Sequence, residues 1–235
     1  MILKQWKIIQ KKTKRNKMSV KLVSITHPSL EKEMTPEEFI VYIARVSNPS
    51  NQMNTETAPK LLNYLIKWKH WSPFEFVDMT VEIVTRRSIA AQILRHKSFS
   101  FQEFSQRYSA AANIQDIELR KQAEKNRQSS AEPHDPEWVG GVKLSDIVNG
   151  HFQASLNLYN EMLQAGIARE VARDVLPLAT ETTMYMKGSV RSWIHYLELR
   201  TADYTQKEHR DIANGIKDIF TQNFPIISGA IEWGT

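Results

Sequence analysis

The sequence predicts an α+β fold, a helix-rich single domain. Two observations predict it. Most apolar residues recur at helical spacing, and only two or three short segments, scattered among the helices, alternate like strands. No internal repeat or domain linker interrupts the 235 residues, a length that allows one domain to bury a proper core.

The chain is expected to enter the fold with a strand and a helix. Residues 20–26 fit a short strand. Thr35 then suits a helix N-cap, with Pro36 at the first helical position and Glu38 at the capping-box position. The helix should run to about residue 46.

A helix, a strand and a second helix are expected next. Residues 58–69 carry leucines on one helical face, and residues 77–83 alternate apolar with polar side chains, which is typical of a half-buried strand. Ser88 is expected to open a short helix over residues 89–96. The polar and aromatic segment 98–109 has no helical period and predicts a loop.

The second half of the chain is predicted to be mainly helical. Residues 122–143 are charged and contain two prolines and two glycines, which indicates a mobile surface excursion. A long helix should follow over residues 146–165, capped by Ser145 and ended by Gly166. The remaining predicted elements are a helix over 168–175, a strand over 182–187, and helices over 190–199 and 207–223.

Most of the excess positive charge lies in residues 1–17. This segment holds seven Lys and Arg residues and no acid, so the rest of the chain has 24 basic against 26 acidic residues, a charge of about −2. We expect residues 1–17 to be a basic, disordered arm and residues 18–235 to be the domain. The arm could contact nucleic acid or an anionic membrane, or translation could start at Met18.

Several function classes lack support in the composition. Without cysteine, the chain has no disulfide, thiolate nucleophile or Cys-ligated zinc, which is compatible with a reducing cytoplasm. The histidines form no H-E-x-x-H motif, so no metal site is expected. No apolar run is long enough to cross a bilayer, and the N-terminus lacks a secretory signal pattern. We expect a cytoplasmic protein without a membrane segment.

Two segments concentrate polar groups that a hydrophobic core would exclude. In the first, Gln92, Arg95 and His96 would share a helical face at i, i+3 and i+4 spacing. In the second, Arg169 and Arg173 are four residues apart. The other members of the two segments are Lys97, Gln102, Glu103, Ser105, Arg107, Tyr108, Arg191, His195 and Arg200.

Two interpretations of these arginines compete. Arginines on short helices usually form a solvated face or surface ion pairs. Their density beside Ser, Gln and aromatic residues favours a phosphorylated nucleotide instead, because the guanidinium fork binds phosphate bidentately. Neither G-x-G-x-x-G nor G-x-x-x-x-G-K-[ST] occurs, so side chains and helix N-termini would have to hold the ligand. The near-neutral body disfavours double-stranded nucleic acid.

Four separated blocks resemble the flavin-dependent thymidylate synthase family. Arg95-His96-Lys97, seven residues and then Ser105 resemble its R-H-R-x7-S signature, within the segment QILRHKSFSFQEFSQRY. The segment from His70 to Glu75, HWSPFE, resembles H-x-[ST]-P-F-E. ARDVLPL and VRSWIHYLELR follow in the family's order, so the similarity covers roughly residues 20–224.

The resemblance implies a fold, a reaction and an assembly. The fold would have a small central antiparallel sheet. The reaction would methylate deoxyuridine monophosphate (dUMP) to dTMP, with 5,10-methylenetetrahydrofolate as one-carbon donor and FAD, reduced by NADPH, as hydride source. The active site would form where subunits of a homotetramer meet.

The resemblance also assigns residues to ligands. Flavin contacts, the last two supplied by another subunit, would be Ser72, Glu75, Arg95, His96, Lys97, Glu103, Arg191 and His195. Contacts to dUMP would be Gln92, Arg95, Glu103, Ser105, Arg107, Arg173 and Arg200. The catalytic pair would be Arg200, which stabilises negative charge developing on the uracil ring, and His70, near the flavin on the folate side.

Three positions depart from the family pattern. Lys97 replaces the second arginine of the signature, and Gln102 and Ser189 stand where asparagine is common. The changes at Lys97 and Ser189 leave open a nucleotide-binding regulator without turnover, and the basic arm leaves open a nucleic-acid-binding protein. Ser105 next to a signature histidine suggests a nucleophile, but we expect it to bind the nucleotide beside Arg107 without forming a covalent bond.

Overall fold

The protein is built on a four-stranded antiparallel sheet in this computed structural model, which describes residues 18–110, 113–138, 140–231 and 233. The strands lie in the order β1-β2-β6-β3. They are β1 (Ser19–Ile25), β2 (Asp78–Arg86), β6 (Glu181–Ser189) and β3 (Ser100–Glu103). The α+β class and the small central antiparallel sheet are confirmed.

Alternating burial explains the two central strands. Met79, Val81 and Ile83 are fully buried on one face of β2, and Met184 and Met186 continue that face on β6. Apolar side chains at every second position are what a strand needs to cover a core on one side. All three predicted strands are therefore confirmed, β6 being longer than expected.

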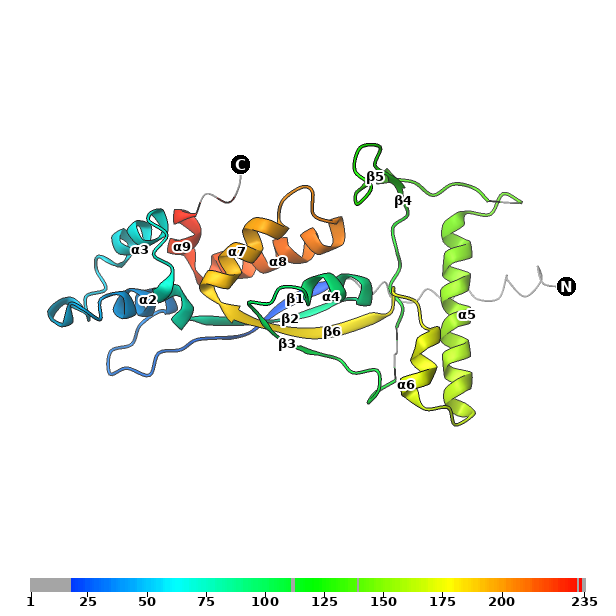
Figure 1. Ribbon diagram of the computed structural model, residues 1–235, viewed down its shortest axis with the longest axis horizontal. Helices are drawn as coiled ribbons and strands as arrows, with labels where there is room; N and C mark the ends of the chain where they lie inside the picture. The colour runs from blue at the N-terminus through cyan, green and yellow to red at the C-terminus, as the bar shows by residue number, and fades with distance from the viewer. Residues whose placement is uncertain (1–17, 111–112, 139, 232, 234–235) are drawn as a thin grey trace.

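Three helices lie on one side of the sheet (Figure 1). α4 (Arg87–Ile93) contacts β2 and β6, α7 (Val190–Arg200) packs on β6, and α8 (Lys207–Asn223) packs on β1. Trp193 of α7 is fully buried, and its indole N–H donates to the carbonyl of Met79 at 2.9 Å. The main core therefore joins α7 to the middle of the sheet.

A second set of helices lies at one end of the sheet (Figure 1). It comprises α2 (Pro36–Ala44), η2 (Pro49–Asn51), α3 (Ala58–Lys67), η3 (Ser72–Phe76) and α9 (Pro225–Ala230). The predicted capping box of α2 is confirmed, because Thr35 and Glu38 each accept the other's backbone N–H, at 3.2 and 2.8 Å. α9 was not predicted, since six residues are too few to show a helical period.

The opposite end holds a separate helical unit (Figure 1). It comprises α5 (Leu144–Gln164), α6 (Arg169–Ala172) and η4 (Arg173–Val175). The unit has a small core of its own, in which Tyr159 and Ala172 are fully buried. Gly166 follows α5 with a φ of 84°, a conformation that glycine adopts without steric cost, so the predicted helix end is confirmed.

The start of α5 differs from the prediction. The helix begins at Leu144, and Ser145 is not its cap. Instead, the backbone N–H and the hydroxyl of Ser145 both donate to the carboxylate of Asp135, at 2.9 and 2.7 Å. The side chain that accepts hydrogen bonds at the start of α5 is therefore Asp135, in the preceding segment, and not Ser145.

The bounds of α4 also differ from the prediction. The helix starts at Arg87 rather than after Ser88, and the backbone N–H groups of both residues donate to the carbonyls of Thr180 and Leu178. It ends at Ile93, three residues earlier than expected. The long-range backbone bonds to the segment before β6 fix the start, and local periodicity cannot reveal them.

Two segments predicted without regular structure contain strands. Residues 98–109, expected to be a loop, include β3, which pairs with β6 over residues 100–103. The charged excursion over 122–143 is partly ordered by a small hairpin of β4 (Arg120–Gln122) and β5 (Ser130–Pro133). Apolar and polar residues alternate only weakly in both segments, so the sequence pattern does not predict either pairing.

Close packing attaches the segment before β3 to β6. The ring of Phe99 lies over Gly188, where an added Cβ atom would stand 2.5 Å from the Phe99 Cδ1 and Cε1 atoms. The same ring contacts Trp193 edge-on, with 4.6 Å between ring centroids. Residues 95–97 lie just before Phe99 in the sequence, separated from it by Ser98.

The predicted arm over residues 1–17 lies outside the described residues. Met18, the first residue described, packs against the main core. None of the helices in the described part of the chain is long and apolar enough to span a membrane.

Candidate active site

One group of predicted site residues lies where α4, α7 and α8 meet. Arg200, at the end of α7, donates from Nε to the Nε2 atom of His96 at 2.9 Å. The Oε1 atom of Gln92, on α4, lies 3.3 Å from the Nδ1 atom of His209, on α8. The Nε2 atom of His209 lies 3.0 Å from the hydroxyl of Tyr196. These five residues are named the buried polar group.

The two histidines of this group are neutral at physiological pH. Burial, reinforced by the positive charges of Arg200 and His195, lowers the pKa of His96 to about 4. Burial, followed by the charge of Arg200 and, once His96 is protonated at low pH, by the charge of His96, lowers the pKa of His209 to about 3. A neutral His96 accepts at Nε2 and carries its proton on Nδ1, which orients the guanidinium of Arg200.

A buried ion cluster lies behind this group. Glu208 on α8 forms ion pairs with Arg86 at 2.9 Å and with Arg120 at 2.8 Å, and all three side chains are at most 10% exposed. Gln206 also donates to the Glu208 carboxylate, at 2.9 Å. Although burial raises the pKa of Glu208, hydrogen bonds from its own N–H, Gln206 and Arg120 and the charge of Arg86 outweigh it, giving a pKa of about 2.

The predicted common helical face of Gln92, Arg95 and His96 is wrong, because α4 ends before Arg95. Gln92 and His96 are half-buried and reach α8 and α7, whereas Arg95 and Lys97 are exposed in the turn after the helix. The structure therefore separates the signature into inward and outward side chains.

A second set of predicted residues gathers around the start of α7. Glu75 in η3 accepts from the Ser189 hydroxyl at 2.5 Å and from Arg191 Nη1 at 2.9 Å. Ser189 is also the N-cap of α7, where it accepts the backbone N–H of Ser192. His195, one turn after Arg191, is exposed. The resemblance assigned Arg191 to another subunit's flavin site, but within this chain it pairs with Glu75.

His70 and Ser72 lie beside this set at the end of α3. His70 is exposed, its backbone N–H donates to the carbonyl of Leu65 at 2.8 Å, and its ring meets Tyr64 edge-on at 5.8 Å. Ser72 is exposed at the first position of η3. Lys69, with a φ of 57°, makes the turn that precedes them.

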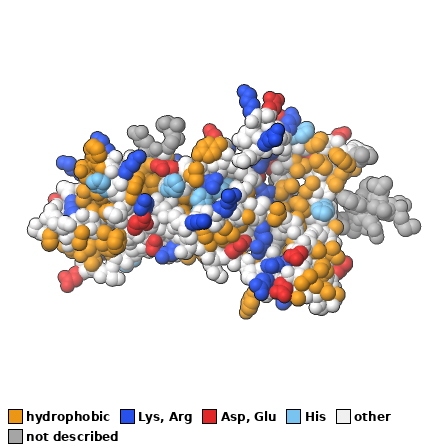
Figure 2. All heavy atoms as spheres, viewed as in Figure 1, with side chains coloured by type: hydrophobic (Ala, Val, Ile, Leu, Met, Phe, Trp, Pro, Cys, Tyr) orange, Lys and Arg blue, Asp and Glu red, His pale blue; other side chains and the backbone are white. Residues whose placement is uncertain are grey.

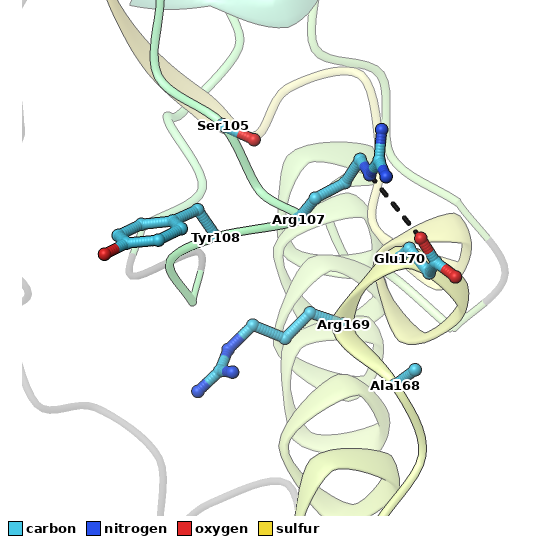
Figure 3. A pocket seen from close by; sticks show the side chains of 6 residues that line it. All are labelled: Ser105, Arg107, Tyr108, Ala168, Arg169 and Glu170. Carbon is cyan, nitrogen blue, oxygen red and sulfur yellow. Dashed lines mark ion pairs between the residues drawn. The ribbon is translucent and has the colours of Figure 1, made fainter.

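A third group lies on the loop after β3 and on α6, lining a cavity of about 550 Å³ (Figure 3). Arg107 and Glu170 point toward one another, with 3.5 Å between Nε and Oε2, while Arg169 extends beneath Tyr108. Ser105 also lines this cavity. The cavity residues, together with Arg173 three positions after Glu170, are named the open arginine group.

Two residues predicted to bind the nucleotide do not line this cavity and contact neighbouring elements instead. Arg173 Nε donates to the backbone carbonyl of Glu170 at 3.2 Å. Glu103 in β3 accepts from the Thr182 hydroxyl at 2.8 Å and lies 3.5 Å from Arg87 Nη1. Both side chains are thus held in place by neighbouring strands or turns.

Sequence reasoning missed the residues behind Gln92. His209 and Tyr196 are both fully buried, and Glu208 is nearly so. One signal could have found His209: it continues the spacing of Ile212 and Ile216 on the buried face of α8, where a polar ring needs a partner.

Comparison with known families defines the class of protein. Residues 29–226 match the family model described as "Thymidylate synthase complementing protein". A solved structure of a UMP/dUMP methylase, PolB from Streptomyces cacaoi bound with 5-Br dUMP, superposes with a TM-score of 0.72. It covers 92% of this chain and 95% of the other chain at 24% identity, which shows a shared fold.

Two curated relatives match over their full length. A probable flavin-dependent thymidylate synthase from Paramecium bursaria Chlorella virus 1 is 50% identical over 219 residues, and a flavin-dependent thymidylate synthase from Synechocystis is 47% identical over 222 residues. Each match covers 92% of this chain and 100% of the relative. The chain therefore belongs to the flavin-dependent thymidylate synthases, a family of enzymes.

Proposed function

We propose that the protein methylates dUMP to dTMP, with 5,10-methylenetetrahydrofolate as one-carbon donor and FAD, reduced by NADPH, as hydride source. The observation that carries this proposal is the contact between Arg200 and His96, one from each of two family segments, beside Gln92. Family membership supports the reaction type. The absence of cysteine excludes a thiolate attack on the pyrimidine ring.

Arg200 would polarise the uracil ring. Because neutral His96 accepts from its Nε, the guanidinium is oriented, and within the described residues no hydrogen bond from its two terminal nitrogens competes with a ligand. A fixed positive charge at a ring carbonyl stabilises the negative charge that develops in the transition state. Gln92 would hydrogen-bond the same nucleotide from α4.

The residues assigned to FAD suit an anionic dinucleotide. Arg95 and Lys97 are exposed, and within the described residues neither forms an ion pair, so both can reach phosphate oxygens. Glu75 is oriented by Ser189 and Arg191, and His195 lies one turn further along α7. When bound, the reduced flavin supplies the hydride that the uracil ring receives.

His70 would lie near the flavin ring on the folate side, and Ser72 would contact the flavin. Both are exposed next to η3, which also carries Glu75. The backbone bond of His70 to Leu65 and its edge contact with Tyr64 hold the imidazole at this surface. We expect His70 to take part in catalysis and Ser72 to hold the flavin.

The complete site would combine two subunits of a homotetramer. In one chain, the buried polar group contacts α8, whereas Ser105 and Arg107 face α6. If Arg107 binds the phosphate of a nucleotide held by Arg200 of another chain, mixing inactive Arg107→Ala and Arg200→Ala proteins should restore part of the turnover. Two variants that stay inactive after subunit exchange would contradict a shared site.

Two measurements test the reaction itself. The purified protein should absorb as a flavoprotein, bleach with NADPH without oxygen, and release tritium from labelled dUMP when methylenetetrahydrofolate is added. A protein that stays colourless after FAD is added would contradict the proposal. Flavin binding without tritium release would favour a nucleotide-binding regulator.

A matched pair of variants tests the flavin assignment at the signature. Arg95→Ala should weaken flavin or nucleotide binding by about 1.5–3 kcal/mol, the effect of losing a hydrogen bond from a charged group. Lys97→Arg should bind like the parent, since the charge is kept. Equal flavin affinity for Arg95→Ala and the parent would remove Arg95 from the site.

The basic segment over residues 1–17 is proposed to lie outside the catalytic domain, which would comprise residues 18–235 of a cytoplasmic enzyme. Its deletion should leave flavin binding and turnover intact and should lower any salt-sensitive binding to nucleic acid. Loss of flavin from the truncated protein would place the segment in the fold.

A further inference from the structure

A continuous chain of hydrogen bonds runs behind Gln92. Gln206 Nε2 donates to the Glu208 carboxylate at 2.9 Å, and Gln92 Nε2 donates to Gln206 Oε1 at 2.7 Å. Gln92 Oε1 then meets His209 Nδ1 at 3.3 Å, and His209 Nε2 meets the Tyr196 hydroxyl at 3.0 Å. We name this chain the amide relay.

The direction of every bond in the relay follows from Glu208. A carboxylate paired with Arg86 and Arg120 is ionised and can only accept hydrogen bonds. Gln206 must therefore turn its NH₂ group to Glu208 and its carbonyl to Gln92. Gln92 must in turn donate to that carbonyl, which leaves its own Oε1 facing His209.

The same logic selects one tautomer of His209. Facing a carbonyl oxygen, Nδ1 has to carry the proton, so Nε2 of the neutral ring is an acceptor. Tyr196 must donate its hydroxyl proton to that nitrogen. Both side chains are fully buried, so water does not offer either ring an alternative partner.

We propose that His209 and Tyr196 are positioning residues that, together with Gln206 and Glu208 on the other side, hold the side-chain amide of Gln92 in one orientation toward the nucleotide. The inference rests on the proposed function, which assigns Gln92 to dUMP. Gln92 is half-buried and keeps one N–H and one lone pair outside the relay. An amide free to flip would present donor and acceptor interchangeably, whereas a locked one is preorganised for its ligand.

The alternative is that the hydrogen bond between His209 and Tyr196 only stabilises the junction of α7 and α8. The two interpretations differ in one respect: a relay acts on dUMP through Gln92, and a packing contact does not. A substitution that removes only the hydroxyl of Tyr196 therefore separates them better than a large truncation of a buried ring.

Calorimetric titration of dUMP into flavin-loaded protein tests the proposal, together with steady-state KM and kcat and the melting temperature. Tyr196→Phe and His209→Leu should weaken dUMP binding roughly 3- to 10-fold, the effect of one hydrogen bond, and should raise KM more than they lower kcat. His209→Asn should recover part of the affinity, because its amide can still donate at the position of Nδ1.

Two controls make the result specific. Tyr185→Phe removes a hydroxyl that bonds Glu82 on the sheet at 2.9 Å, outside the relay, and should bind dUMP like the parent. In a Gln92→Leu background, Tyr196→Phe should have no further effect on dUMP affinity, because the group that the relay orients is gone.

The outcomes distinguish this inference from the proposed function. A parent protein that binds no dUMP contradicts the proposed function. A parent that binds dUMP, with Tyr196→Phe and His209→Leu folded and within about twofold of it, overturns the relay while the function stands. Effects of Tyr196→Phe that add fully to those of Gln92→Leu overturn it as well, since they show a route that bypasses Gln92.

Discussion

The buried polar group and the open arginine group differ in how each is supported. The first is carried by α4, α7 and α8, which pack on the main core around Trp193, and an ion cluster at Glu208 lies behind it. The second is carried by a loop and by α6, whose small core centres on Tyr159. The side chains of Arg107 and Glu170 are 66% and 57% exposed.

The comparison shows that packed helices support the first group, whereas the second group is largely exposed in the single chain. Around the open arginine group, apolar side chains also remain at the surface: Leu158, Val171 and Leu178 are 47%, 52% and 72% exposed. Figure 2 shows hydrophobic side chains on the viewed face at the end of the molecule where α5 lies. Such a surface fits the proposal that a second subunit faces this group.

The largest expected effect concerns the support of the buried polar group. Glu208→Ala would leave Arg86 and Arg120 without their shared carboxylate, and should lower the free energy of unfolding by about 3–5 kcal/mol in urea titrations. The control is Glu118→Ala, since Glu118 pairs with Arg120 while 41% exposed; it should cost about 0–1 kcal/mol. Equal losses would show that the two carboxylates are equivalent and would break the comparison.

The second prediction concerns the smaller core. Tyr159→Ala should cost about 3 kcal/mol locally, because it empties the centre of the unit formed by α5 and α6. Hydrogen exchange should accelerate in those helices while β2 and β6 stay protected. Asn160→Ala, at an exposed neighbouring position, is the control. Equal acceleration in the sheet would mean that the two cores unfold as one.

The third prediction is the pH dependence of stability that His209, in the buried polar group, contributes. The pKa of His209 is about 3 in the fold, against a usual value of 6.5. As the pH falls below 6.5, the unfolded chain binds a proton that the folded chain does not, so the contribution of His209 to stability is present above 6.5 and is lost toward pH 3.

The measurement is unfolding by urea at several pH values. Relative to the parent, His209→Asn should lack a slope of about 1.4 kcal/mol per pH unit between about pH 6 and 4. Glu37, whose pKa burial raises to about 6, acts in the opposite direction but is common to both proteins. Parallel curves for parent and variant would show that folding does not change the pKa of His209 and would contradict the prediction.

The smallest expected effect is at the open arginine group. Ser105→Ala should raise the KM for dUMP about fivefold, or about 1 kcal/mol for one neutral hydrogen bond, and leave residual turnover. Intact-mass spectrometry of the quenched reaction should show no nucleotide attached to Ser105. An adduct there, or complete loss of turnover in folded, flavin-loaded Ser105→Ala, would make the serine a nucleophile.

The sequence predicts those features whose signals are local. The capping box at Thr35 and the alternation of β2 each depend on neighbours within a few residues, and both are confirmed. β3 was missed because its partner, β6, lies more than 80 residues further along the chain. The early end of α4 has a related cause: Gln92 contacts residues 206 and 209, and no local pattern records such contacts.

The site was predicted unevenly for the same reason. Family motifs mark Arg95, His96 and Arg200, because their spacing along the chain is distinctive. They do not show that His96 and Arg200, 104 residues apart, bond each other. His209 and Tyr196 carry no motif, and only the polar residue on the buried face of α8 hinted at them.

Gly188 shows how packing alone can constrain a residue. Because Gly188 has no side chain, the Phe99 ring can pack directly on β6. The backbone N–H of Phe99 donates to the carbonyl of His96 and so closes the turn that contains residues 95–97. Even alanine at this position would displace the ring, and the shift would reach the signature two residues away. In a saturation mutagenesis screen for growth, Gly188 would therefore tolerate substitution as poorly as the signature arginine. Such a result could be misread as a ligand contact, although its cause would be the space that the Phe99 ring needs.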